Sequence, residues 1–193
     1  MTSITFNRFT VLRLALRLVK VIPWLIGGVI VATVGYCFVS SQYKLHLNVS
    51  DSLPAYVFME AKRPPAIGDV VMFCPSLKNR AVQELFYRGL MYRDVNTKCE
   101  ARLVPLAKVL VALEGSTVQV TVQGLVIDNR LLPNTKPLTF DRQGRPLTSM
   151  ALGAYQVQPG QAWVASTYNE RSFDSRYYGP VEAKGLVTLE TLF

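Results

Sequence analysis

The stretch PLAKVLVALEG, from Pro105 to Gly115, places one lysine inside an otherwise apolar run. Side chains alternate between the two faces of a β-strand. The two expected faces consist of Leu106, Lys108, Leu110 and Ala112, and of Val109, Val111 and Leu113. A strand that is apolar on both faces is typical of a buried position in a sheet. We therefore expect residues 104–113 to form a buried strand, followed by a turn at Glu114 and Gly115.

Short runs of strand-forming residues lie on both sides of this stretch. The further expected strands are Ala55–Met59, Asp69–Phe73, Thr117–Val122, Leu125–Ile127, Ala162–Ala165 and Leu186–Leu189. Residues 76–92 carry apolar side chains at helical spacing, which predicts one helical insertion. Residues 121–127 are expected to form a hairpin, and residues 133–155 an extended surface loop. The predicted fold class is mainly β, an antiparallel domain with one small inserted helix.

Residues 21–43 form an apolar run of about 23 residues without a formal charge, long enough to cross a bilayer. It is longer than the apolar region of a cleaved signal peptide, and Val39-Ser40-Ser41 is a poor cleavage site. Half of the net charge of +8 precedes the run, on Arg8, Arg13, Arg17 and Lys20. The positive-inside tendency then places residues 1–20 in the cytoplasm, a single span at 21–43, and residues 44–193 outside. Residues 9–20 either lie along the inner leaflet or extend the spanning helix.

The rest of the composition excludes several classes of function. No basic patch interleaved with aromatic residues follows the apolar run, so nucleic-acid binding is not expected. No phosphate-binding or dinucleotide-binding glycine motif is present, and no cofactor is expected. The cysteines and one distant histidine do not have the spacing of metal ligands, so no metal site is expected. That histidine, His46, follows the apolar run closely, and we expect an interfacial side chain rather than the base of a catalytic triad.

Two of the three cysteines, Cys74 and Cys99, bracket the expected helical insertion. In an oxidising compartment they can form a disulfide. Closing a loop of about 25 residues contributes roughly 3–4 kcal/mol to stability in the chain-entropy model. The alternative is two unrelated buried thiols. Cys37 lies inside the apolar run and is expected to be an apolar filler.

Lys108 is a candidate general base because of its apolar strand. A lysine in water titrates near pH 10.4 and is protonated at neutral pH, so it cannot accept a proton from a serine hydroxyl. Burial disfavours the charged form and lowers the pKa by up to several units. The alternative is a lysine at the sheet edge whose ammonium group reaches solvent.

Two further motifs accompany the lysine strand. Residues 48–56 read NVSDSLPAY, in which Ser52 is followed by an apolar residue and proline, and residues 172–180 read SFDSRYYGP. In this order, behind an apolar span, the three motifs resemble the S26 signal peptidases, and more closely their conjugative-transfer branch, the TraF-type pilin peptidases. The resemblance runs from about Val49 to about Val187. It implies a signal-peptidase-like β domain in the periplasm, anchored in the bacterial inner membrane.

The resemblance also implies roles for individual residues. Ser52 matches the nucleophile and Lys108 the general base. The hydroxyl of Ser50 and the backbone N–H of Ser52 match the donors of the oxyanion hole, although an ordinary turn hydroxyl is the alternative for Ser50.

The third motif matches residues that support the site in this family. Ser172 corresponds to a serine that positions the lysine amine, and Asp174 and Arg176 to a structural ion pair. The sequence departs from the family pattern where Gly-Asp-Asn often opens this motif, because residues 166–168 read Ser-Thr-Tyr. Gly115-Ser116 likewise replaces a Gly-Asp pair. These changes leave the serine and the lysine intact.

The expected function is that of a membrane-anchored Ser/Lys signal peptidase that cleaves exported precursors, by resemblance a conjugative pilin, which it hydrolyses or cyclises. Expected partners are the precursor protein, membrane lipid and proteins of the conjugation apparatus. The apolar residues expected to rest on lipid are Leu45, Leu47, Val57 and Phe58. The alternative function is a non-catalytic assembly component of a conjugation or secretion channel that retains the peptidase fold.

Overall fold

The computed structural model describes residues 8–192, with side chains described for residues 19–39 and from residue 43 onward. The chain divides into two compact units, Met1–Lys44 and Leu45–Phe193. The side chains of Arg8, Arg13 and Arg17 lie outside the described residues. Their predicted position in the cytoplasm therefore stays a prediction.

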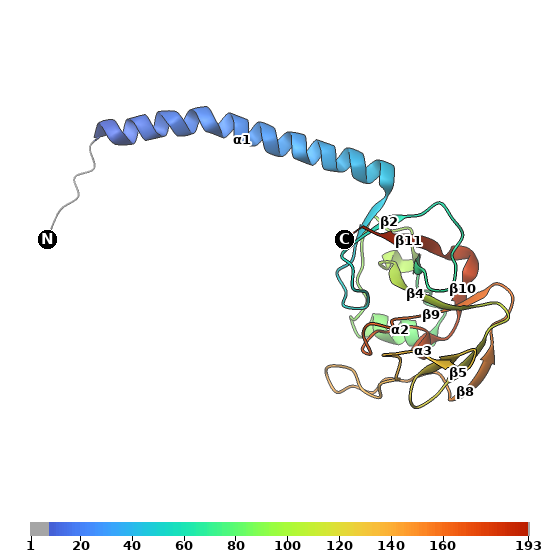
Figure 1. Cartoon of the computed structure of the whole chain (residues 1–193). Helices are drawn as coiled ribbons and strands as arrows, with labels where there is room; N and C mark the ends of the chain where they lie inside the picture. The colour runs from blue at the N-terminus through green and yellow to red at the C-terminus, as the bar shows by residue number, and fades with distance from the viewer. Residues whose placement is uncertain (1–7, 193) are drawn as a thin grey trace. The chain divides into compact units, whose positions relative to one another are not determined.

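The first unit contains one long helix, α1 (Arg8–Tyr43), with Pro23 inside it (Figure 1). The helix is continuous, as expected if residues 9–20 extend the predicted span. Its segment Val19–Val39 is, among the described residues, the one helical segment long and apolar enough to cross a membrane. Large apolar side chains along it are exposed, including Trp24 and Leu25. Length and composition of this kind suit a membrane anchor or a signal sequence.

The second unit is built from two antiparallel sheets (Figure 1). The seven-stranded sheet has the order β1 (Leu45–Leu47), β2 (Val57–Glu60), β11 (Val187–Thr191), β3 (Val70–Phe73), β4 (Leu106–Leu113), β9 (Gln161–Ala165) and β10 (Val181–Glu182). The four-stranded sheet has the order β7 (Arg130–Leu131), β6 (Leu125–Ile127), β5 (Thr117–Val120) and β8 (Gly153–Gln156). The remaining elements are α2 (Arg80–Tyr87), α3 (Ser175–Tyr178) and two short 3₁₀ turns, η1 (Glu100–Arg102) and η2 (Ala183–Gly185). The predicted fold class, a mainly β antiparallel domain with a small helical insertion, is confirmed.

Strand β4 carries Lys108 and lies between β3 and β9 in the larger sheet, with Lys108 directly opposite Val71. The predicted alternation of its faces is wrong from Ala112 onward, because Ala112 shares a cluster with Val111 and Leu113 packs with Leu110. The register with β9 shifts between Leu110 and Ala112, because a β-bulge inserts an extra residue there. As a result, Leu110 packs in one apolar cluster while Val111 and Ala112 both pack in another.

Three apolar clusters form the core of the second unit. The first lines the smaller sheet and includes Trp163 of β9, and the second joins the larger sheet to Val82 of α2. The third consists of Leu53, Ala55, Phe58 and Leu189. Phe58 is only 2% exposed, so the prediction that it rests on lipid is wrong. The third cluster instead anchors the segment around Ser52 against β2 and β11.

Element boundaries differ from the prediction mainly in the connecting segments. The helical insertion is shorter than residues 76–92, because Asn79 caps its N-terminus by accepting hydrogen bonds from Ala81 N and Val82 N. The segment 133–155 is not a loop throughout, since its last residues belong to β8, which pairs with β5. Strands β1, β7 and β10 have only two or three residues each and were not predicted.

Cys74 and Cys99, the two residues that bracket α2, are joined by a disulfide. Cys74 follows the last residue of β3, and Cys99 precedes η1. The disulfide therefore links the segment that follows α2 to the end of β3 in the larger sheet.

Candidate active site

The segment 48–56 forms a tight loop held by the side chain of Asn48. Its carbonyl oxygen accepts hydrogen bonds from the backbone N–H of Ser50 at 3.0 Å and from the Ser50 hydroxyl at 2.9 Å. Its amide group donates to the carbonyls of Leu53 and Ala55, at 3.3 and 2.9 Å. Asparagine stabilises loops in this way because it bonds to nearby backbone groups. Ser52 is 8% exposed at the centre of this closed loop.

Lys108 is 4% exposed on β4. Burial lowers the pKa of its amine from 10.5 to about 8; the charge of Asp174 opposes this shift, and the charge of Arg176 adds to it. Among the described residues, the amine has no hydrogen-bond or ion-pair partner. The alternative of an ammonium group at a sheet edge does not apply, because β4 has a neighbour on each side.

Ser52 and Lys108 line one cavity of about 430 Å³. Ser50 and Ser172 also line it, so four of the predicted site residues border the same space. Its apolar walls include Met72 of β3, Leu85 of α2 and Phe173. A second cavity of about 460 Å³ borders Ser50 and Ser52 from the segments 138–147 and 169–177 and is lined by several arginines. Ser52 is therefore accessible from two cavities despite its burial.

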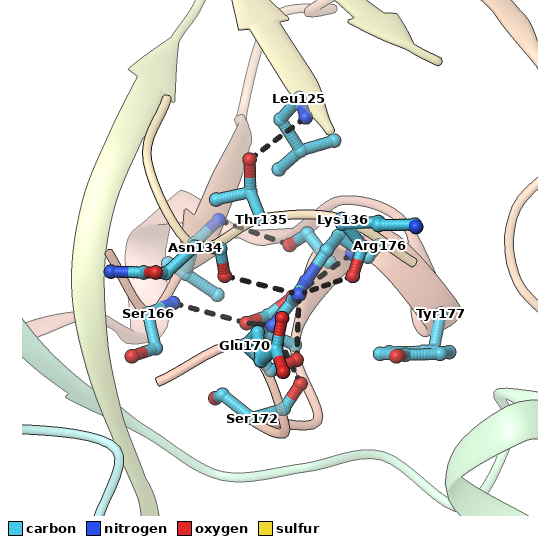
Figure 2. Close-up of polar contacts among 12 residues, drawn as sticks. Leu125, Asn134, Thr135, Lys136, Ser166, Glu170, Ser172, Arg176 and Tyr177 are labelled. Carbon is cyan, nitrogen blue, oxygen red and sulfur yellow. Dashed lines mark hydrogen bonds and ion pairs between the residues drawn. The ribbon is translucent and has the colours of Figure 1, made fainter. Parts of the chain in front are cut away.

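The predicted pair Asp174 and Arg176 forms a completely buried, bidentate ion pair. The two hydrogen bonds, from Nε to Oδ1 and from Nη2 to Oδ2, are both 2.8 Å. The other guanidinium hydrogens go to backbone carbonyls, namely those of Asn134, Lys136, Glu170 and Ser172 (Figure 2). A buried ion pair is tolerated when its remaining donors are satisfied in this way. The pair joins the segment 134–136 to the segment 170–176 and does not line either cavity that contains Ser52.

The hydroxyl of Ser172 is buried and has no hydrogen-bond partner among the described residues. It borders the same cavity as Lys108. Leaving a buried hydroxyl without a hydrogen bond costs free energy. The Ser172 hydroxyl is therefore available to bind either a group that enters the cavity or the lysine amine. The hydroxyl of Ser50 differs, because it already donates to Asn48 and must rotate before it can donate to an oxyanion.

Sequence reasoning missed two residues that contact the Ser52 loop. The hydroxyl of Ser166 donates to the carbonyl of Ser52 at 2.6 Å, and the amide of Asn169 donates to the carbonyl of Asp51 at 3.3 Å. These contacts join residues more than 100 positions apart, and nothing in the sequence marks them except the departure from Gly-Asp-Asn at Ser166.

His46 also borders the cavity that contains Ser52 and Lys108. Its Nε2 lies 3.0 Å from Oε1 of Glu60, across the β1–β2 pair. The histidine thus contacts a carboxylate of its own sheet. Because an arginine such as Arg171 of the same cavity stays protonated, His46 is the side chain to compare with Lys108 as a proton acceptor. No group of three or more potential metal ligands occurs in the part of the chain that the structure describes.

The antiparallel β domain, the apolar N-terminal helix and the cavity shared by a serine and a buried lysine agree with one class of protein. Over residues 18–192 the chain matches the family described as signal peptidase, peptidase S26, and it belongs to that family. It is 32% identical over 163 residues to the conjugal transfer protein TraF of Agrobacterium tumefaciens (strain 15955), covering 84% of this chain and 88% of the relative. It is 25% identical to a plasmid transfer protein TraF of Escherichia coli, with the same 84% and 88% coverage.

A solved structure, the signal peptidase I of Enterococcus faecalis V583, aligns with a TM-score of 0.37 and 19% sequence identity. The alignment covers 68% of this chain and 100% of the other.

Proposed function

We propose that the protein is a membrane-anchored serine endopeptidase in which Ser52 is the nucleophile and Lys108 the general base. The observation that carries the proposal is that Ser52 borders the same cavity as a buried lysine whose amine has a pKa of about 8. About one tenth of such an amine is neutral at pH 7 and about half at pH 8, and the neutral form can accept the serine proton. Membership of the signal peptidase family supports the reaction class.

The reaction is a two-step acyl transfer. Ser52 Oγ attacks the scissile carbonyl while Lys108 takes its proton, and the negative charge that develops on the carbonyl oxygen is stabilised by the N–H of Ser52. Lys108 then returns the proton to the leaving amine as the peptide bond breaks and an ester with Ser52 forms. Water, activated by the neutral Lys108, hydrolyses this ester. The Ser172 hydroxyl, which borders the same cavity, orients the lysine amine.

The substrate is an exported precursor, and we propose a pilin subunit of a conjugation apparatus because two relatives are named as transfer proteins. The segment Val19–Val39 anchors the enzyme in the inner membrane, with the domain that contains Ser52 in the periplasm. If the amino terminus of the precursor attacks the ester instead of water, an amide forms, Ser52 regains its proton, and the product is cyclic. The cyclic product is lighter than the linear one by one water molecule.

The test is to follow the precursor in cells that carry Ser52→Ala in the full-length chain. We expect the unprocessed precursor to accumulate and its mature form to disappear, as judged by mass spectrometry. Ser76→Ala is the matched control, because Ser76 is exposed and lies outside both cavities that contain Ser52. Normal processing with Ser52→Ala would instead favour a non-catalytic assembly component.

A further inference from the structure

Two side chains of the segment 166–169 hold the backbone carbonyls on either side of the Ser52 Cα. The hydroxyl of Ser166 donates to the Ser52 carbonyl at 2.6 Å. The amide of Asn169 donates to the Asp51 carbonyl at 3.3 Å. The peptide units before and after Ser52 are therefore both fixed by contacts from a distant part of the chain.

The contact to the Asp51 carbonyl matters because that carbonyl shares a peptide unit with the N–H of Ser52. The unit is planar and trans, so its C=O and N–H point in opposite directions. A donor that fixes the carbonyl oxygen of Asp51 therefore also fixes the direction of the Ser52 N–H. This N–H is the backbone donor that the proposed reaction requires.

Ser166 is itself held rigidly. It is 0% exposed, and its backbone N–H donates to Oδ2 of Asp174 at 3.0 Å. Its hydroxyl oxygen also accepts from the backbone N–H groups of Tyr168 and Asn169, at 3.2 and 3.0 Å. One hydrogen bond donated and two accepted satisfy the hydroxyl completely.

The chain of contacts thus runs from Ser52 through Ser166 to the buried pair of Asp174 and Arg176. A functional group keeps its geometry when the residues behind it are locked by packing and hydrogen bonds. Through this chain the buried ion pair is connected to the Ser52 loop, although it lines neither cavity that contains Ser52.

We infer that Asn169 and Ser166 are positioning residues of the oxyanion hole, which orient the Ser52 N–H toward the oxygen of the tetrahedral intermediate. Asn169 fixes the peptide unit that carries this N–H. Ser166 acts less directly, because it fixes the peptide unit after Ser52 and its hydroxyl oxygen accepts from the Asn169 N–H. The inference rests on the proposed peptidase function and deepens it. A misdirected N–H weakens binding of the charged intermediate but leaves contacts to the uncleaved peptide in place, so kcat falls while KM stays near its wild-type value.

Two substitutions test the two contacts separately. Ser166→Ala removes the hydroxyl. Asn169→Asp keeps the size of the side chain and the oxygen that accepts from Arg171 N, but removes the donor to Asp51. Because losing one oxyanion donor costs about 10²–10³ in kcat, we expect a misaligned donor to lower kcat by about 10-fold to 100-fold.

The matched control is Thr188→Val, which deletes another buried hydroxyl that donates to a backbone carbonyl, that of Arg63 at 3.1 Å. It should leave kcat within twofold of wild type. A second readout is the affinity for a peptide aldehyde, which forms a tetrahedral adduct with Ser52. We expect this affinity to fall in parallel with kcat for the two test variants only.

The inference is overturned if Ser166→Ala and Asn169→Asp both keep wild-type kcat and aldehyde affinity, or if they alter KM alone. If Ser166→Ala does not fold, the kcat and aldehyde affinity of Asn169→Asp alone test the inference. The Ser52→Ala variant separates this inference from the proposed function. Full cleavage by the purified Ser52→Ala variant refutes Ser52 as the nucleophile and with it the proposed mechanism. An inactive Ser52→Ala beside fully active Ser166→Ala and Asn169→Asp variants refutes only the positioning role of Ser166 and Asn169.

Discussion

Lys108 links the chemistry of the site to the stability of the fold. Its amine is buried on a central strand, and burial is the main reason that its pKa falls to about 8. The charge of Asp174 raises the Lys108 pKa and the charge of Arg176 lowers it. Burial therefore remains the dominant influence on this pKa. The same desolvation that favours the neutral amine therefore opposes folding whenever the amine is protonated.

The rate of cleavage should follow the titration of Lys108. Below pH 8 only the neutral fraction of the amine can take the Ser52 proton, so kcat/KM should rise about tenfold per pH unit and level off above a pKa of about 8. The measurement is peptide cleavage by the full-length protein between pH 5.5 and 10. Ser76→Ala should give the same profile. A rate that does not change between pH 6 and pH 9 would rule out Lys108 as the base.

Replacing Lys108 by methionine should stabilise the protein while abolishing activity. The folded pKa of about 8 lies below the unfolded value of 10.5, so below pH 8 both states bind the proton and the folded state bears the full penalty, roughly 3 kcal/mol. Between about pH 8 and pH 10.5 only the unfolded state binds the proton, so the stability of the wild-type protein rises with pH over this range. Lys108→Met should therefore gain stability at pH 7 and lose that advantage near pH 10.5.

Denaturant unfolding of both proteins at pH 7 and pH 10 measures this difference. A Lys108→Met variant that is less stable than wild type by the same amount at both pH values would show that the lysine is not penalised by its burial.

At the scale of elements, the helical insertion forms part of the cavity wall. Leu85 of α2 borders both cavities that contain Ser52. Helix α2 is held at its N-terminus by Asn79, whose amide also donates to the carbonyl of Tyr178 at 2.6 Å. The disulfide between Cys74 and Cys99 closes the same insertion. Cap and disulfide together fix the position of Leu85.

Removing the disulfide should destabilise the domain. The double substitution of Cys74 and Cys99 by serine opens a loop of 25 residues and should lower the free energy of unfolding by about 3 kcal/mol. The measurement is denaturant unfolding with and without reductant. Reductant should shift the wild-type midpoint toward that of the double variant and leave the variant unchanged. If reductant does not affect the wild-type midpoint, the disulfide does not stabilise the fold.

Local patterns in the sequence predict most of the elements but not their irregularities. The apolar run around Lys108 predicts β4, and alternation predicts β5. The bulge after Leu110 depends on the pairing with β9 and is invisible in the alternation of β4 itself. Strand β8 was missed because its residues are mostly exposed, so no apolar pattern marks it.

The residues of the candidate site can likewise be predicted only in part from the sequence. Of the residues selected by the family motifs, Ser50, Ser52, Lys108 and Ser172 border one cavity, whereas Asp174 and Arg176 do not. The contacts of Ser166 and Asn169 with the Ser52 loop depend on tertiary geometry between segments over 100 residues apart, which no local pattern encodes.

At the scale of the whole molecule, the chain combines an apolar helical unit with a β unit that contains all the predicted site residues. The helix carries the segment Val19–Val39, which is suited to span a membrane. The four basic residues before and within the start of that segment favour a cytoplasmic N-terminus. The proposed function requires this orientation, because exported precursors reach the site from the periplasmic side.

A reporter fusion tests the orientation. A reporter enzyme that is active only in the cytoplasm, fused after Phe193, should remain inactive in intact cells, because the positive-inside tendency places the β unit outside. The control is the same reporter fused before Met1, which should be active. Strong activity of the C-terminal fusion would contradict the proposed topology.

The most direct test of the Ser52–Lys108 mechanism is the cleavage rate of Lys108→Arg. Arginine keeps the positive charge and much of the bulk, but its guanidinium stays protonated and cannot accept the serine proton. We expect Lys108→Arg to be as inactive as Lys108→Ala while remaining folded, and His46→Ala to retain cleavage, since the histidine beside the same cavity is not the base. Cleavage by Lys108→Arg at a rate near wild type would contradict the mechanism, and loss of cleavage in His46→Ala alone would transfer the role of base to His46.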